Sequence, residues 1–301
     1  MRATPPPVLG ALLTVQLLFA TLHVVGKVVL AELTPLALAG TRVLIATPLL
    51  LVLAWRHDRT IPDRRDWPRI ALLGLLGIFA NQTLFLLGLH YTTATSSAIL
   101  MPSIPVFTAG AAALLGVERV AGRRLGGVVV AAAGALVLLD PTRLETDGTA
   151  TLGNALILSN CLAYSFFLVL LQPLFARVPW RTLIAWCFLF GSIGTLAVSA
   201  PAMAAADWSG LSTRAAAGIL YIGVVPTALN FALNTWAVRR SSPAIVAAFT
   251  TLQPVLTTLL ASWTLGESLR PSQAVGFVLI VSGLLLVSSR RPSAPTSPLA
   301  G

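Results

Sequence analysis

The sequence predicts an all-α membrane protein of ten transmembrane helices, arranged as two inverted repeats of five. Composition, the spacing of apolar segments and an internal repeat lead to this fold class. Of the 301 residues, 56% are hydrophobic and only 10% are charged, whereas about 25% of the residues in a soluble domain are charged. A soluble globular protein, a disordered chain and a disulfide-stapled secreted fold are therefore excluded.

Ten apolar segments reach or approach the roughly 20 residues that a helix needs to cross a bilayer. Connections rich in proline, glycine and aspartate separate them, as at 62–65 and 207–210. The fifth and tenth segments are short and are expected to stand nearly upright in the membrane. The predicted spans are 8–30, 35–55, 68–90, 94–116, 123–139, 152–175, 181–203, 211–238, 243–265 and 271–288.

The distribution of arginine predicts that both termini are cytoplasmic. With the N-terminus inside, the inner segments hold 15 basic residues and the outer segments hold three, namely Arg143, Arg214 and Arg270. Cytoplasmic loops carry such an excess, so we expect a multi-pass protein of the cell (inner) membrane. The sequence pI of about 11.3 therefore reflects loop charge, and no nucleic-acid partner is expected.

An offset of 149 residues aligns the chain with itself. Asn81 then matches Asn230, Pro105 matches Pro254 and Gly134 matches Gly283. We expect a first repeat at 8–139, a second at 152–288 and a cytoplasmic tail at 289–301. Because each repeat has five spans, the second enters the membrane from the opposite side, an arrangement typical of secondary transporters with a site near the membrane midplane.

Two segments of the chain resemble the EamA-type branch of the drug/metabolite transporter superfamily. They are Ser97-Ala98-Ile99-Leu100-Met101-Pro102-Ser103-Ile104-Pro105 running to Glu118, and Ser242-Pro243-Ala244-Ile245-Val246-Ala247-Ala248-Phe249 running through Leu252-Gln253-Pro254 to Leu265-Gly266-Glu267. The resemblance covers about 8–288 and departs from the family pattern at Val117. It implies a central cavity lined by spans one, three, four, six, eight and nine, with spans five and ten outside.

Polar and aromatic residues within the spans are the candidates for this cavity, because polar groups in a membrane bundle usually face inward. In spans three and eight, the repeat mates Asn81 and Asn230 share helical faces with other candidates; the alternative is hydrogen bonding between helices. Tyr164 is either a cavity wall or a core tyrosine. The predicted cavity residues are His23, Asn81, Phe85, Ser97, Met101, Tyr164, Asn230, Asn234, Thr250 and Gln253.

Four residues are candidates for bending the helices. Pro102, Pro105 and Pro254 each remove a backbone donor. The carbonyls that lose this donor either bind substrate or permit the helix to bend; the alternative is a static kink. Gly88 lies on the same face as Asn81 and Phe85.

His23 and Arg42 are charged or titratable residues inside spans. His23 is mid-span and is the candidate for any proton coupling, since the spans hold no carboxylate near their middle. Lys27, on the same face, is expected to extend to the interface. For Arg42 we expect a structural role, in which it reaches outward or pairs with Glu32.

Glu118 and Glu267 end spans four and nine, where a carboxylate opposes the helix dipole. We interpret both as structural residues that interact with the N-terminus of the following helix, and not as proton carriers.

These observations favour a secondary transporter, with export of amino-acid-like metabolites or drug-like solutes as the favoured activity. A passive channel and a lipid flippase remain alternatives, and an intramembrane enzyme has least support because no His-Glu-x-x-His or Gly-x-Ser-x-Gly motif occurs. Phosphate-bearing substrates are disfavoured, since Lys27 and Arg42 are the basic residues that fall inside the apolar runs. No cofactor or metal is expected, and Cys161 and Cys187 lack metal-ligand spacing.

Overall fold

In the computed structural model, the described part of the chain consists of helices joined by short loops and contains no strand. The structure describes residues 5–92, 97, 100–117, 122–139, 148–265 and 271–288; within these ranges it describes the backbone alone at 23, 27, 123, 124, 135, 138, 139, 257, 258, 261–265, 271–274, 287 and 288. The predicted structural residues Glu118 and Glu267, and the side chain of His23, lie outside this description.

The first half of the chain forms helices that follow four of the five predicted spans closely; in the fourth, predicted at 94–116, the helix covers Ser103–Leu114. Two of them begin with proline at their first position, where a missing N–H costs nothing. The elements are α1 (Pro6–Leu30), α2 (Pro35–His57), η1 (Arg64–Asp66), α3 (Trp67–Gly74), η2 (Leu75–Ala80), α4 (Asn81–Tyr91), α6 (Ser103–Leu114) and α7 (Gly122–Leu139).

The second half repeats this order. Ser212 and Ser242 cap α10 and α12, accepting hydrogen bonds from the N–H groups of Ala215 and Ile245. The elements are α8 (Gly148–Leu171), η4 (Gln172–Ala176), α9 (Trp180–Ala204), α10 (Thr213–Ile222), η5 (Gly223–Leu229), α11 (Asn230–Arg240), α12 (Pro243–Phe249), α13 (Leu252–Leu265) and α14 (Pro271–Ser288).

Six helical stretches within the described residues are long and apolar enough to cross a membrane. They are Pro6–Leu30, Pro35–His57, Arg64–Tyr91, Gly148–Ala176, Trp180–Ala204 and Thr213–Arg240. Shorter apolar helices at Ser103–Leu114, Leu125–Gly134, Pro243–Leu256 and Val275–Leu286 occupy the other four predicted spans. The chain is therefore a multi-pass helical membrane protein.

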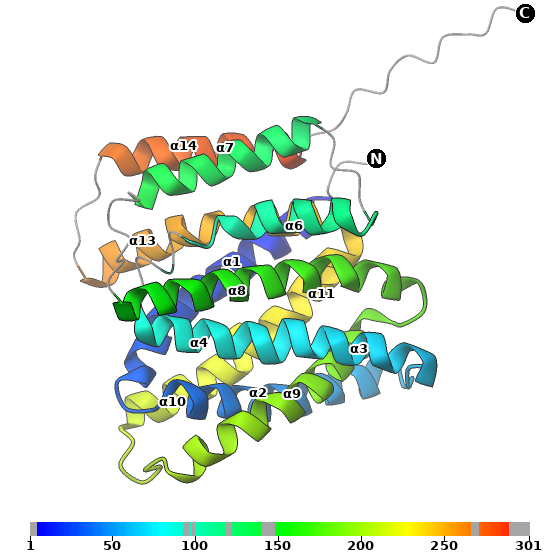
Figure 1. Ribbon diagram of the computed structural model, residues 1–301, viewed down its shortest axis with the longest axis vertical. Helices are drawn as coiled ribbons and strands as arrows, with labels where there is room; N and C mark the ends of the chain where they lie inside the picture. The colour runs from blue at the N-terminus through cyan, green and yellow to red at the C-terminus, as the bar shows by residue number, and fades with distance from the viewer. Residues whose placement is uncertain are drawn as a thin grey trace, which may run out of the picture.

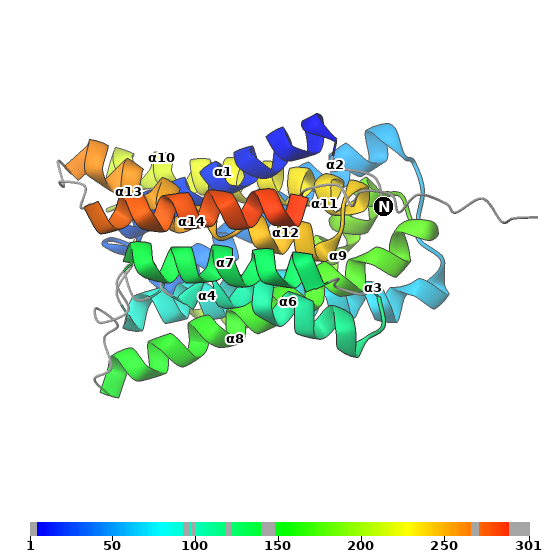
Figure 2. The same ribbon diagram turned by 90° about the horizontal axis from the view of Figure 1, so that it is seen from above.

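The helices form two layers, and each layer combines both halves of the chain. In one layer α8 packs against α4 and α6; in the other α1 packs against α10, α11 and α13 (Figure 2). At one edge α2 packs against α9, and at the opposite edge α7 packs against α14 (Figure 1). The first helix of each half thus completes the layer of the other half.

Glycines bring α7 and α14 into backbone contact. A Cβ placed on Gly134 would lie 2.7 Å from the nitrogen of Ile280 and 2.8 Å from the carbonyl oxygen of Gly276. A Cβ on Gly283 would in turn lie 2.6 Å from the carbonyl oxygen of Gly127. Because the 149-residue offset pairs these glycines, the same contact occurs twice with the halves exchanged.

Two departures from regular α-helix recur at equivalent positions. The π-helices η2 and η5 end immediately before Asn81 and Asn230, so each half widens its third helix at the same place. Spans four and nine are interrupted at Met101–Pro102 and Thr250–Thr251, and there the N–H groups of Ile104 and Gln253 donate three residues back, each over 3.0 Å. π-Helices of this kind frequently occur at functional sites.

Candidate functional site

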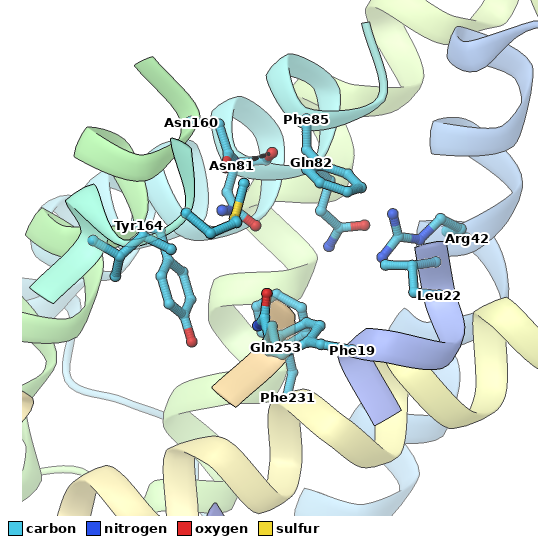
Figure 3. A pocket seen from close by; sticks show the side chains of 12 residues that line it. Phe19, Leu22, Arg42, Asn81, Gln82, Phe85, Asn160, Tyr164, Phe231 and Gln253 are labelled. Atoms are coloured by element: carbon cyan, nitrogen blue, oxygen red, sulfur yellow. Dashed lines mark hydrogen bonds between the residues drawn. The ribbon is translucent and has the colours of Figure 1, made fainter. Parts of the chain in front are cut away.

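A cavity of about 50 Å³ lies where the two layers meet. That volume holds roughly three or four water molecules, so a larger solute requires the walls to move apart. Seven of the predicted spans contribute, namely the first four and the sixth, eighth and ninth. The lining residues are Phe19, Leu22, Arg42, Asn81, Gln82, Phe85, Met101, Ile104, Asn160, Tyr164, Phe231 and Gln253 (Figure 3).

Arg42 gives one side of the cavity a positive charge. Its side chain is in the interior at 2% exposure, and its Nε donates to the Thr227 hydroxyl over 3.1 Å. That hydroxyl donates in turn to the carbonyl of Ile222 over 2.6 Å, within the turn that η5 widens. Arg42 therefore lies in the site itself and does not reach outward to the membrane surface.

The expected pairing of Arg42 with Glu32 is not found. The Glu32 carboxylate instead accepts from the backbone N–H of Ser212 over 2.8 Å and from its hydroxyl over 2.7 Å. These bonds hold the pKa of the Glu32 carboxyl below its ordinary value. Glu32 thus joins the loop after α1 to the beginning of α10, where a carboxylate complements the helix dipole.

Amide side chains form the next part of the wall. The Asn160 amide donates to the backbone carbonyl of Asn81 over 2.6 Å and so fixes α8 against α4. Gln82 is 2% exposed, and neither its oxygen nor its nitrogen has a hydrogen-bond partner among the described residues. A buried amide without partners is costly, so Gln82 can offer its amide nitrogen as donor and its oxygen as acceptor to a bound solute.

Aromatic rings form the opposite wall. Phe231 packs edge-on against Phe19 and Phe188 at centroid separations of 6.2 and 5.2 Å, and Phe167 lies 6.5 Å away. Tyr164 stacks on Phe167 at 6.1 Å. Such pairs stabilise the packing by about 0.5–1.5 kcal/mol each beyond burial, which makes this side of the cavity a rigid apolar surface.

The interruptions in spans four and nine also border the cavity. Met101 and Ile104 line it from the first interruption, and Gln253 lines it from the second. The Gln253 amide donates to the Gln16 side chain over 2.9 Å, which ties α13 to α1. Thr250 is buried, and its hydroxyl donates to the carbonyl of Ala247 over 2.7 Å, satisfying the end of α12.

Five of the predicted cavity residues line the cavity in this structure: Asn81, Phe85, Met101, Tyr164 and Gln253. Four others are buried without lining it: Ser97, Asn230, Asn234 and Thr250. The Asn234 amide donates to the Tyr164 hydroxyl over 2.9 Å. Asn234 therefore contacts a cavity-lining residue without lining the cavity itself. The repeat mates Asn81 and Asn230 therefore differ, since Asn81 borders the cavity and its mate does not.

The predicted bending residues have identifiable structural surroundings. Pro105 and Pro254 lie in the first turns of α6 and α13, where a helix restarts and a missing N–H leaves no carbonyl unsatisfied. Pro102 is the residue before α6. A Cβ on Gly88 would lie 2.7 Å from Ile157 and 3.0 Å from the carbonyl of Gly153, so this glycine permits close packing of α4 on α8.

Sequence reasoning did not select Gln82, Leu22 or Phe231 as cavity residues. A stripe at positions 81, 85 and 88 leaves out Gln82, yet positions 81, 82 and 85 together span an arc of only about 100° at 3.6 residues per turn. A polar residue adjacent to Asn81 in mid-span was the available signal. Nothing in the pattern distinguished Leu22 or Phe231 from other apolar residues of their spans.

Comparison with known proteins agrees with this architecture. The profile of the EamA-like transporter family matches twice, at residues 7–140 and 151–289. The chain belongs to the EamA-like transporter family. A crystal structure with 19% identity shares the fold of this EamA protein at a TM-score of 0.75, covering 93% of this chain and 96% of that one.

Curated relatives of this EamA protein include proteins that are named as transporters. One is "Protein WALLS ARE THIN 1" of Arabidopsis thaliana, 29% identical over 92% of this chain and 81% of its own. A "Probable terminal-alkyne amino-acid exporter" of Streptantibioticus cattleyicolor is 29% identical over 84% of each chain. An "Uncharacterized transporter" of Archaeoglobus fulgidus is 26% identical over 92% of this chain and 95% of its own. Family and relatives point to transport and not to catalysis.

Proposed function

We propose that this protein is a secondary transporter that moves small metabolites or drug-like solutes, with amino-acid-like solutes favoured and export as its direction. The observation that carries the proposal is the cavity between the two layers, which draws its lining from both halves of the chain. Each half also brings its own helix interruption and its own π-helix to this region. Alternating access requires such a shared site between two similar units.

The proposed topology is ten spans in two inverted repeats of five. It is supported by the paired interruptions and by the α7–α14 contact, which recurs with the halves exchanged. Rocking of one unit against the other would expose the cavity to each side of the membrane in turn. The proposed location is the cell membrane, with both termini in the cytoplasm.

The chemistry of the cavity fits an amphiphilic solute. Its lining combines Arg42 and the amides of Asn81 and Gln82 with the rings of Phe19 and Phe85. A polar head and an apolar body together describe many amino-acid-like compounds, and a relative carries the name of an amino-acid exporter. Proton coupling through His23 belongs to the same proposal.

The test has two stages. First, metabolites released by cells that overexpress the protein are compared with those from cells carrying an empty vector, which identifies the solute. Second, proteoliposomes preloaded with that solute are placed in a trace of its labelled form. We expect transient accumulation of label, because exchange through an alternating site is accelerated by solute on the other side.

A passive channel and a lipid flippase give different results in this assay. A channel equilibrates the label without transient accumulation, and a flippase exchanges labelled lipid between leaflets while leaving soluble metabolites untouched. Either result would replace the transporter proposal. Liposomes without protein give the leak rate that is subtracted.

A further inference from the structure

The charge of Arg42 has no counter-ion among the described residues. The described residues that line the cavity include no carboxylate. Asp66 is the acidic residue that the described chain buries, and it pairs with Arg177 over 3.2 Å. With its Nε bound to Thr227, Arg42 retains both Nη groups, and the end of its guanidinium extends toward Gln82 (Figure 3).

An uncompensated charge at this depth is expensive, because burial removes the water that would solvate it. The helix ends that border the cavity do not reduce the positive potential around Arg42. The first turns of α6 and α13 border the same cavity through Ile104 and Gln253, and a helix N-terminus carries a partial positive charge. A bound anion would supply what the chain lacks.

We infer that the cavity binds small amphiphilic monocarboxylates, with the carboxylate held by the two Nη groups of Arg42 and by the amide nitrogen of Gln82. This inference rests on the proposed transport function and names the substrate class. The planar guanidinium presents parallel donors that match the two oxygens of a carboxylate. A single buried cation balances one negative charge, which favours a carboxylate over a phosphate dianion.

The aromatic side chains of the cavity favour an apolar body for the rest of the ligand. Across the cavity from Gln82 lie Phe19 and Phe231, which pack edge to face at 6.2 Å. An aliphatic or aromatic body placed there loses contact with water and gains contact with ring surfaces. The cavity thus places the head group on α2 and the body against α1 and α11.

Matched pairs of ligands test the inference with purified protein in a neutral detergent. The pairs are 3-phenylpropionate and 3-phenylpropionamide, hexanoate and hexanamide, and L-leucine and L-leucinamide, with thermal unfolding as the readout. We expect at least one carboxylate to raise Tm more than its amide, since a ligand that binds only the folded state stabilises it. If no carboxylate exceeds its amide, the inference is wrong.

Variants then locate the carboxylate. Arg42→Gln should weaken carboxylate binding about ten- to a hundredfold, the loss expected for charge-assisted hydrogen bonds, and leave amide binding unchanged. Gln82→Leu should cause a smaller loss. Arg214→Gln, which removes an exposed arginine at the beginning of α10, is the matched control and should bind as wild type does. Carboxylate preference that persists in Arg42→Gln would overturn the inference.

A second variant of Arg42 and a phosphonate ligand test the same inference independently. If Arg42→Gln does not fold, Arg42→Lys retains the charge but loses the planar fork, and it should bind carboxylates more weakly than wild type while still preferring them to amides. 2-Phenylethylphosphonate should shift Tm less than 3-phenylpropionate does, and a larger shift would contradict the assignment to carboxylates. Counterflow of neutral solutes without carboxylate preference would remove this inference alone, whereas carboxylate binding without counterflow would remove the transporter proposal.

Discussion

Glu32 illustrates how one exposed side chain joins distant parts of the chain. Its carboxylate accepts two hydrogen bonds from Ser212, the residue that caps α10. The backbone N–H of Ser212 contributes most to lowering the pKa of Glu32, and its hydroxyl contributes next. A carboxyl with a lowered pKa in the folded state stabilises the protein above its ordinary pKa and stops doing so as the pH falls through the lowered value.

We therefore predict that Glu32→Gln lowers Tm at pH 7 and that the difference from wild type narrows below about pH 4.5, the ordinary value for this carboxyl. The measurement is thermal unfolding of both proteins in detergent between pH 7 and pH 3. A difference that stays constant over this range would mean that the charge of Glu32 does not stabilise the contact with Ser212.

His23 is the residue through which we predict any proton coupling. Histidine titrates near neutral pH, and no carboxylate that would serve instead is found among the cavity-lining residues that the structure describes. Solute flux into proteoliposomes is compared with and without an imposed pH gradient, for wild type and His23→Gln. Wild type should respond to the gradient and the variant should not.

Two other results of that experiment have distinct meanings. An equal response of both proteins would assign coupling to another group. If neither responds, the transporter is driven by the solute gradient alone.

Arg42 shows where residue-level prediction from sequence fails. For an arginine seven residues into a span, the sequence left two outcomes: reaching outward, or pairing with Glu32, the acidic residue nearest along the chain. The observed partner, Thr227, lies 185 residues away, in a π-helix that apolar periodicity does not signal. Local spacing identifies the need for a partner, but the packing of α2 against η5 determines which partner is present.

At the scale of helices, boundaries were more predictable than interruptions. The spans predicted at 35–55 and 271–288 correspond to α2 at Pro35–His57 and α14 at Pro271–Ser288, because long apolar runs with polar ends determine helix limits. The interruption in span nine lies at Thr250–Thr251, and Pro254 falls four and three residues later, inside the restarted helix. Proline marks the restart, while the threonine hydroxyls satisfy the carbonyls of Ala247 and Ala248.

The contact between α7 and α14 yields a prediction about helix packing. Gly134→Ala should destabilise the protein by about 1–3 kcal/mol, the usual range for overpacking, because its Cβ would meet the backbone of α14 at Ile280 and Gly276. Gly126→Ala is the control on the same helix, since nothing lies within 4 Å of a Cβ there. It should be neutral or stabilising by up to about 1 kcal/mol, given the higher helix propensity of alanine.

The measurement is the midpoint of unfolding by heat or by denaturing detergent for wild type and the two variants. Equal midpoints for Gly134→Ala and Gly126→Ala would show that α7 and α14 do not pack in close backbone contact at Gly134.

For the whole molecule, we predict that both termini face the cytoplasm. Single cysteines replace Thr60, Ser209 and Ser297, and intact cells are treated with a membrane-impermeant maleimide. Position 209 should be labelled, whereas positions 60 and 297 should be protected until the membrane is opened. Both native cysteines are fully buried, so they should contribute little background. Labelling at 297 but not at 209 would reverse the orientation.

The arrangement of the layers could be anticipated only in part. The resemblance to EamA-type transporters implied that spans five and ten would be peripheral, and α7 and α14 do pack together at one edge. It also predicted a shared cavity, although span two joined the lining only through Arg42. That Asn81 lines the cavity while Asn230 does not was not predictable. The two residues are equivalent in the repeat, but their neighbours differ, and the neighbours determine where each amide side chain lies.

The exchange of first helices between layers has a consequence for biosynthesis. Helix α1 ends at Leu30, but its partners α10, α11 and α13 begin only at Thr213. At about 5–20 residues per second, the ribosome needs roughly 10–40 s to produce the intervening chain. During that interval α1 is in the membrane without α10, α11 and α13. In contrast, α8 can pack against α4 and α6 as soon as it is inserted, because both are already made. The layer built around α8 is therefore completed first, and the layer around α1 closes last.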